Sequence, residues 1–104
     1  MRAETLKGHL DFLLLATLAA EPAHGYRIID ELKRRSGGAF DLPEGTVYPA
    51  LHRLEQSGLL ASSWANESGR RRRVYRLTVR GRRALAGERR DWRGFTNAVE
   101  AVVA

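Results

Sequence analysis

Arginine is the residue type in this sequence whose number and placement point most directly to chemistry. Of the 18 Lys and Arg residues, eleven are arginines between Arg70 and Arg93, whereas the first 65 residues are close to balanced in charge. A guanidinium group is planar, stays charged at neutral pH and can donate two parallel hydrogen bonds to a phosphate. A formal net charge of +6 that is distributed so unevenly favours a polyanionic partner.

Four of these arginines, Arg70, Arg71, Arg72 and Arg73, are consecutive. They fall at the end of a turn-rich polar segment, 65–71, which separates two short segments rich in apolar residues, 59–64 and 72–77; this pattern predicts a β-hairpin. The second strand is so rich in arginine that we expect an exposed ribbon and not a central strand. Guanidinium groups at or beside the tip could bridge phosphates or enter a narrow minor groove. The alternative is a solvated basic loop.

Three segments with apolar residues at three- and four-residue spacing precede the hairpin, and each predicts a helix. They cover 6–18, 26–36 and a third segment that begins near Thr46 and stops at Gly58. His24 follows a breaker-rich stretch, so we expect it at a turn or at the start of the second helix.

The start of the third helix is marked by two features. The run 41–44 resembles a capping box. Pro49 has no backbone donor, so we expect the ordered turns to begin near Thr46 or the helix to bend at the proline.

The third helix has an apolar face and a polar face. If Val47, Ala50, Leu51 and Leu54 face the core, a step of about 100° per residue turns Tyr48, His52, Arg53 and Gln56 outward. A helix that enters a major groove presents such residues to phosphates and base edges, and Arg53 could read guanine with two hydrogen bonds. We therefore assign to DNA contacts Thr46, Tyr48, His52 and Arg53. The alternatives are a half-buried packing role for Tyr48 and a solvated charge for Arg53.

A last helix is expected after Thr78, which can cap it. Apolar residues recur there at heptad spacing, which predicts a seam between two copies of the chain made of Leu85, Trp92, Phe95, Val99 and Val102. Gly87 and Gly94 weaken this helix, so it is not expected to stand alone. A sharper interpretation places a flat effector against Trp92, Phe95 and Val99.

Several sequence blocks, in this order, resemble the PadR family of bacterial transcriptional regulators. The most specific is Gly45–Glu55 (GTVYPALHRLE); the others are Gly8-His9-Leu10-Asp11, His24-Gly25-Tyr26, Gly58-Leu59-Leu60, Trp64, Gly69–Thr78 (GRRRRVYRLT), Gly81 and Trp92. The resemblance implies a homodimer joined through the final helix and an operator with inverted half-sites. Many members of the family are released from DNA by a small aromatic or cationic ligand, so the resemblance also implies such an effector.

Together these patterns predict a mainly α (α+β) fold, a winged helix-turn-helix with a C-terminal dimerisation helix. We expect residues 1–78 to form the DNA-binding region and residues 79–104 the dimerisation helix, within one compact unit. The function expected is that of a sequence-specific transcriptional repressor that binds double-stranded operator DNA. The alternative is a winged-helix module that binds structured RNA or a protein partner.

Other classes of protein fit the sequence poorly. It contains no cysteine, and its three histidines lack ligand spacing, so we expect no metal site and no cofactor. The acidic residues are scattered and no phosphate-binding glycine loop is present, which makes an enzyme improbable on chemical grounds. Asp11 interrupts the apolar run near the start, so we expect no export signal. No apolar stretch approaches about 18 residues, so we expect no membrane span, and the absence of cysteine fits a place in the cytoplasm.

Overall fold

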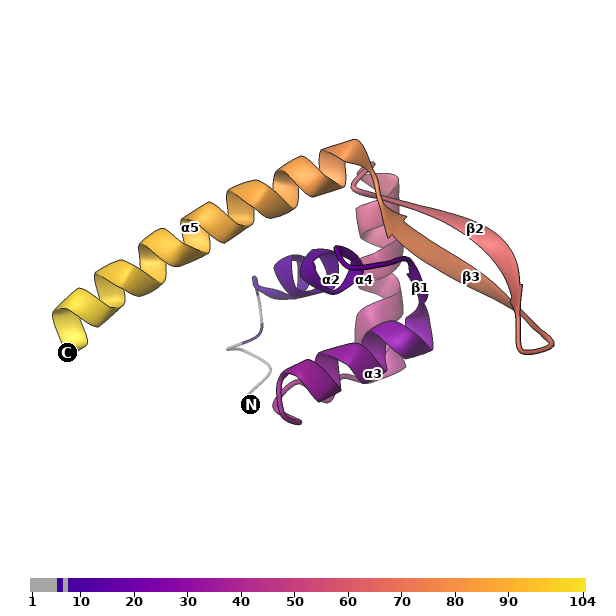
Figure 1. Ribbon diagram of the computed structural model, residues 1–104, viewed down its shortest axis with the longest axis horizontal. Coiled ribbons are helices and arrows are strands. Elements are labelled where there is room, and N and C mark those ends of the chain that lie inside the picture. Colours follow the sequence, from indigo (N-terminus) through magenta and orange to yellow (C-terminus); the bar gives the residue numbers. More distant parts are fainter. Residues whose placement is uncertain (1–5, 7) are drawn as a thin grey trace.

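The computed structural model describes residue 6 and residues 8–104, and Figure 1 shows their arrangement. Three helices pack with a small antiparallel sheet, and a long fourth helix leaves this body and passes α2. The fold is the expected winged helix-turn-helix of α+β class with a C-terminal helix. The elements in chain order are α2 (Leu10–Leu18), β1 (Ala23–His24), α3 (Gly25–Arg35), α4 (Glu44–Gln56), β2 (Leu60–Glu67), β3 (Arg70–Leu77) and α5 (Val79–Val103).

The core lies where α2, α3 and α4 meet the sheet. The helix α4 contributes the apolar face that its spacing predicted. In α3 the predicted face of Tyr26, Ile29 and Leu32 was partly wrong, because Ile28 and Leu32 are buried whereas Tyr26 is exposed. Burial of a large apolar side chain stabilises the fold by about 1.5–3 kcal/mol. The only buried polar residue in the described part of the chain is Thr17, whose hydroxyl donates to the carbonyl of Leu13 at 2.7 Å. The core side chains are Leu14, Leu15, Leu18, Ala23, Ile28, Leu32, Val47, Ala50, Leu51, Leu54, Leu60, Tyr75, Leu77 and Leu85.

The strand β3 is central, so the prediction of a peripheral ribbon was wrong. The sheet order is β1-β3-β2, and Tyr75 pairs with Ala23 on one side and with Ser62 on the other. Because successive side chains in a strand point to opposite faces, Tyr75 and Leu77 reach the core while Arg76 between them stays exposed. β1 has only two residues, which is too short for an alternation pattern to reveal it.

The hairpin is longer than its sequence suggested. The sequence predicts a polar linker over 65–71, but residues of this segment pair across the two strands as far as Glu67 and Arg70. Only Ser68 and Gly69 form the turn, both with positive φ (49° and 76°). A two-residue turn of this kind matches the right-handed twist of the strands, so pairing continues up to the tip.

The helix α4 begins at Glu44, two residues before Thr46, and Pro49 lies inside it. The predicted capping box was wrong, because the N-cap residue is Pro43 and no side chain caps the helix. Asp41 instead places its carboxylate 3.6 Å from the ammonium group of Lys33. Pro49 has no N–H, so the carbonyl one turn earlier in the helix loses its usual intrahelical donor.

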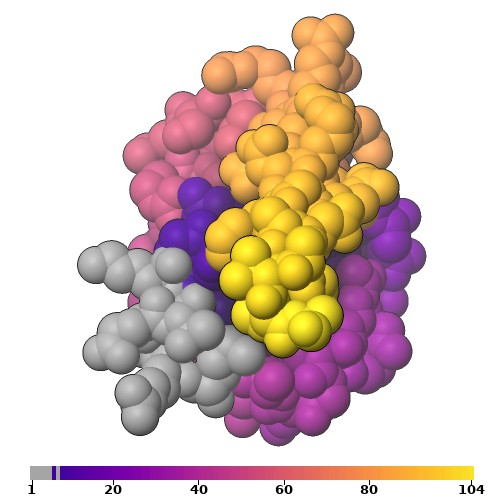
Figure 2. Space-filling view, turned by 90° about the vertical axis from the view of Figure 1, so that its left-hand side faces the viewer, coloured from indigo at the N-terminus to yellow at the C-terminus, as the bar shows by residue number. Residues whose placement is uncertain are grey.

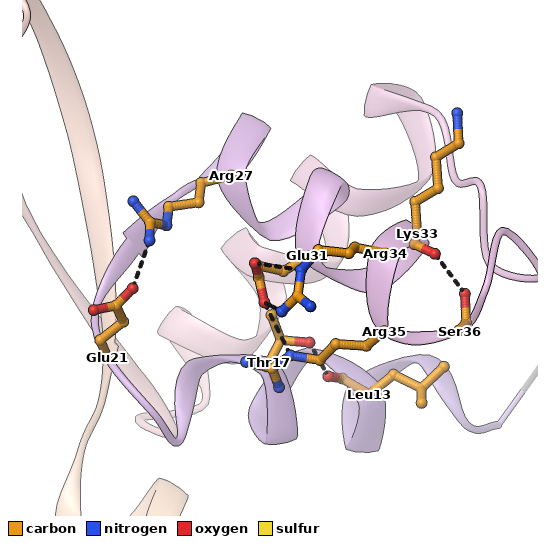
Figure 3. A network of polar contacts seen from close by, with 9 residues as sticks. All are labelled: Leu13, Thr17, Glu21, Arg27, Glu31, Lys33, Arg34, Arg35 and Ser36. Carbon is orange, nitrogen blue, oxygen red and sulfur yellow. Dashed lines mark hydrogen bonds and ion pairs between the residues drawn. The ribbon is translucent and has the colours of Figure 1, made fainter.

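A polar network covers the outer side of α3 (Figure 3). The carboxylate of Glu31 accepts hydrogen bonds from Arg34 and from Arg35, at 2.9 and 3.0 Å for the closest contacts. Arg27 donates to Glu21, which precedes β1, at 2.7 Å. The cations of α3 are therefore largely matched by carboxylates.

The helix α5 is joined to the body through Thr78 and Gly81. The Thr78 hydroxyl accepts from the Gly81 amide at 3.0 Å and donates to the Gly58 carbonyl at 2.7 Å, as expected for a capping residue. Gly81 lies so close to Leu59 that a Cβ atom there would overlap the Leu59 carbonyl. The start of α5 is thus fixed against the residues that follow α4.

The predicted dimer seam divides into two parts. Leu85 is 2% exposed and belongs to the core of the single chain, which corrects its assignment to a contact between copies. The cause is the close contact at Gly81, which holds the first turns of α5 on the body. The rest of the seam is open, with Trp92 at 43%, Phe95 at 61%, Val99 at 39% and Val102 at 84% exposure. Figure 2 shows the last turns of α5 in yellow in front of the body, with α2 in indigo beside them.

The contact between Gly81 and Leu59 predicts opposite effects for two glycine substitutions. Gly81→Ala should lower the free energy of unfolding by about 1–3 kcal/mol, because backbone would have to move to admit the methyl group. Gly94→Ala, in the same helix with open space around it, should raise it by about 0.5–1 kcal/mol through helix propensity. Urea unfolding of both variants at one protein concentration measures this; a neutral Gly81→Ala contradicts the tight contact.

Candidate nucleic-acid interface

The outer face of α4 is the one that the sequence predicted. Val47, Ala50, Leu51 and Leu54 are buried, whereas Thr46, His52 and Arg53 are exposed. Tyr48 is half-buried, with its ring against Gly25, where a Cβ atom would overlap it, and 6.2 Å from the ring of Tyr26. Tyr48 therefore packs against α3 and also keeps part of its side chain exposed.

Arg53 is engaged within the protein. Its two terminal amino groups donate to the two carboxylate oxygens of Asp11 in α2, each at 2.7 Å, and these hydrogen bonds raise its pKa. Such a paired geometry fixes the guanidinium plane and joins the last turns of α4 to α2. The sequence pointed to a guanidinium free to read bases; the partner 42 residues away was not visible in it.

A cleft separates α3 and α4 from the hairpin. It is lined by two tyrosines, a histidine and the arginine row: His24, Gly25, Tyr26, Tyr48, Arg70, Arg71, Arg72 and Arg73. The guanidinium carbon of Arg72 lies 5.7 Å from the centre of the Tyr26 ring, within cation–π distance. The hydrogen bond between the Tyr26 phenol and Glu44 raises the pKa of Tyr26. Tyr26 and His24 were not predicted to lie at the interface, although both belong to the His24-Gly25-Tyr26 block.

The arginine row alternates between the two faces of the hairpin, as side chains in a strand do. Arg71 and Arg73 place their guanidinium carbons 4.6 and 5.2 Å from the centre of the exposed Trp64 ring. Arg73 also donates to the Ser62 hydroxyl at 2.8 Å. These contacts hold two guanidinium groups in place, and planar groups that are held in advance lose less entropy when they bind an anion.

His24 connects the cleft to the start of α3. Its Nδ1 accepts a hydrogen bond from the Arg27 amide at 3.2 Å, so it is the N-cap that its position predicted. Its Nε2 lies 3.5 Å from a carboxylate oxygen of Glu67 in the hairpin. Burial, followed by the charge of Arg72, lowers the pKa of His24, and the neutral form that can cap the helix is favoured.

A second recess lies between α2 and α5. Trp92 meets His9 edge-on at 5.6 Å between ring centres, and Phe12 and Phe95 lie 6.3 and 6.2 Å from it. Glu88 and Asp91 also line this recess. Val99 does not; it lines an apolar groove further along α5 with Phe95, Ala98, Val102 and Val103. Trp92 and Phe95 are therefore brought together as predicted, whereas Val99 lies apart from Trp92.

The membrane class finds no support in the described helices, none of which is both long and apolar enough to cross a bilayer. A helix-turn-helix beside a basic hairpin instead defines the winged-helix class of regulators.

Comparison with known proteins identifies the family. The transcriptional regulator PadR-like family matches residues 14–87. Transcriptional regulator Rv3488 of Mycobacterium tuberculosis is 44% identical over 77 residues, which cover 74% of this chain and 69% of that protein. The chain belongs to the PadR-like family of transcriptional regulators. The family and this relative are regulators and not enzymes, as the sequence predicted.

Solved structures agree with this assignment. A PadR family transcription regulator from Clostridium difficile R20291 is 32% identical, with a TM-score of 0.82 over 93% of this chain and 100% of that one. A transcriptional regulator from Clostridium thermocellum has a TM-score of 0.88 at 24% identity, covering 100% of this chain and 99% of that one. The second likeness concerns the fold alone.

The lowered pKa of His24 predicts how its contribution to stability depends on pH. Its pKa in the folded state lies below the ordinary value of about 6.5, so the unfolded chain binds the proton more tightly. The free energy of unfolding should therefore fall as the pH drops from about 6.5 through the folded-state pKa. In His24→Asn, which keeps a capping side chain without this titration, the fall should be smaller. Urea unfolding across this pH range tests it, and an unchanged pH profile in the variant would count against it.

Proposed function

We propose that the protein is a transcriptional repressor that binds double-stranded operator DNA as a homodimer. The outer face of α4 enters a major groove, where Thr46, Tyr48 and His52 meet base edges and phosphates. The hairpin follows the flanking backbone through Arg70, Arg71, Arg72 and Arg73. As a regulator acts where its DNA lies, we place it in the cytoplasm.

The observation that carries this proposal is the cleft between α4 and the hairpin. It joins an exposed helix start to the row of four arginines, of which only Arg73 is within ion-pair distance of a carboxylate in the described chain, at 3.9 Å from Glu55. A concave surface lined by one sign of charge concentrates a polyanion there. Tyr26 adds a phenol and an aromatic face to the same wall.

The proposed dimer follows from the open half of α5. Phe95, Ala98, Val99, Val102 and Val103 form an apolar groove, and the ring of Trp92 is close to half exposed. A second copy that covers this face would remove about 25 cal/mol of unfavourable hydration free energy per Å² of apolar surface. Two chains related by a two-fold axis would then present two α4 helices to an inverted repeat.

The recess between α2 and α5 supports the proposed release by a small aromatic effector. Trp92 and Phe95 offer ring faces on which a flat molecule can stack, with His9 and Phe12 beside them. Val99 contributes to the adjoining groove and not to this recess. An effector that binds here would act through α2, which also contacts α4 through Asp11 and Arg53.

Selection of bound duplexes from a random DNA library at physiological salt tests the function. We expect enrichment of an inverted repeat with half-sites about one helical turn apart, because a two-fold dimer presents two recognition helices. A Val99→Asp variant, which places a charge in the proposed dimer groove, should lose this symmetry. Salt-sensitive binding without any motif would contradict the proposal and favour structured RNA or a protein partner.

Arg53 and Asp11 provide a second test. Because Arg53 is held by Asp11, we expect it to position α4 and not to read a base. Arg53→Ala and Asp11→Ala should then weaken operator binding to a similar extent and leave the base preference unchanged, with a coupling energy for unfolding of about 0.2–1 kcal/mol for this partly exposed pair. Competition titrations against operators with single base changes measure the preference. If Arg53→Ala relaxes the base preference and Asp11→Ala does not, Arg53 reads a base and the positioning role is wrong.

A further inference from the structure

The helix α5 carries arginines that the operator-binding surface does not use. In the part of the chain that the structure describes, none of them forms an ion pair with a carboxylate. The polar contact found for them is internal to the helix, from Arg93 Nε to the Arg89 carbonyl at 3.3 Å. We call these exposed residues the α5 arginine stripe: Arg82, Arg83, Arg89, Arg90 and Arg93.

The stripe occupies a different side of the helix from the aromatic recess. With a step of about 100° per residue, Arg83 and Arg90 lie nearly opposite Trp92, whereas Arg82, Arg89 and Arg93 lie about 60–100° from it. Glu88 and Asp91, the nearest acidic residues along the chain, line the recess instead. A second copy bound over Trp92 and the apolar groove therefore leaves most of the stripe open.

The stripe is also remote from the operator surface. Gly81 lies against Leu59, just beyond the C-terminal end of α4, whereas Thr46 and Tyr48 of the operator surface lie near its N-terminal end. A helix of 13 residues is about 20 Å long, so the two ends of α4 lie roughly one double-helix width apart. In Figure 1 α5 starts above α4, and in Figure 2 its orange first half runs along the top of the molecule.

The composition of the stripe indicates the kind of polyanion. On the side of α5 that faces away from Trp92, the side chains beside the arginines are small: Ala86, Gly87 and Gly94. Single-stranded nucleic acids bind through aromatic residues on which bases stack, and protein interfaces centre on a few residues buried in well-packed, desolvated pockets. The stripe has neither, whereas guanidinium groups alone suit the phosphate backbone of a duplex, which carries no sequence information.

We propose that the α5 arginine stripe binds the backbone of a second segment of duplex DNA, without base preference, while the operator occupies α4 and the hairpin. This inference rests on the proposed operator binding and extends it. One bound dimer, with a stripe on each chain, would hold two DNA segments together. Like charges on neighbouring turns destabilise a helix on their own, and phosphates would relieve that repulsion.

A capture experiment tests the stripe. A fluorescent duplex limited to the selected operator is mixed with the full chain and an immobilised duplex that lacks the operator, and the retained fluorescence is measured against salt. The variant Arg82→Gln/Arg89→Gln/Arg93→Gln keeps residues of similar helix propensity. We expect this variant to bind the operator like the original protein. It should retain far less of the fluorescent operator on the immobilised duplex. The slope of log binding to the second duplex against log salt should fall by about 2 to 3, at about 0.9 per lost phosphate contact.

The matched control is Lys33→Gln/Arg34→Gln/Arg35→Gln, which removes the same formal charge from side chains that lie beside Asp41 and Glu31. It should retain the operator on the second duplex. Loss of capture in the control to the same extent would overturn the proposal in favour of net charge alone, as would absence of capture by the original protein. Single-stranded RNA that competes better than duplex DNA would overturn the choice of partner.

The two proposals fail in different ways. If the original protein shows no operator preference, the proposed function fails, and the stripe is then measured with two duplexes that both lack the operator. Bridging that depends on Arg82, Arg89 and Arg93 under those conditions still supports the stripe. If the triple variant bridges the two duplexes as well as the original protein does, the proposed role of the stripe is wrong.

Discussion

The rest of the structure depends on the position of β3 between two other strands. Tyr75 is 1% exposed and pairs with residues of both β1 and β2, so this single strand ties the hairpin to the helical core. Burial raises the pKa of its phenol, and the buried side-chain polar atoms of the described residues all have hydrogen-bond partners. A strand anchored at Tyr75 and Leu77 can carry charge at its other end, because the apolar end fixes the register.

That anchoring explains how adjacent arginines serve different surroundings. The pleat sends Arg72 toward Tyr26 and the cleft, and it sends Arg71 and Arg73 toward Trp64. A shift of one residue in register would exchange these two sets and would also turn Tyr75 out of the core. The same burial that stabilises the sheet therefore decides which guanidinium groups face the start of α4, and stability and placement of charge have one cause.

The sequence allowed much of this fold to be predicted, where periodic burial leaves a pattern. The apolar face of α4 and the cap at Thr78 were predicted because they depend on near neighbours along the chain. β1, the central place of β3 and the core role of Leu85 were not, since each is decided by tertiary packing. The pair of Arg53 and Asp11 joins residues 42 positions apart, and charge alone does not reveal which carboxylate an arginine will meet.

The rigid start of α5 has a mechanical consequence. Gly81 is pressed against Leu59 and Leu85 is buried, so the helix is held at its base while its outer turns project from the body. From Gly81 to Val103 a helix rises about 33 Å, so a tilt of about 10° at the base displaces the far end by about 6 Å. The helix therefore amplifies motion. A displacement at its base that is too small to disturb the core becomes, at the far end, a shift comparable to the rise of two base pairs.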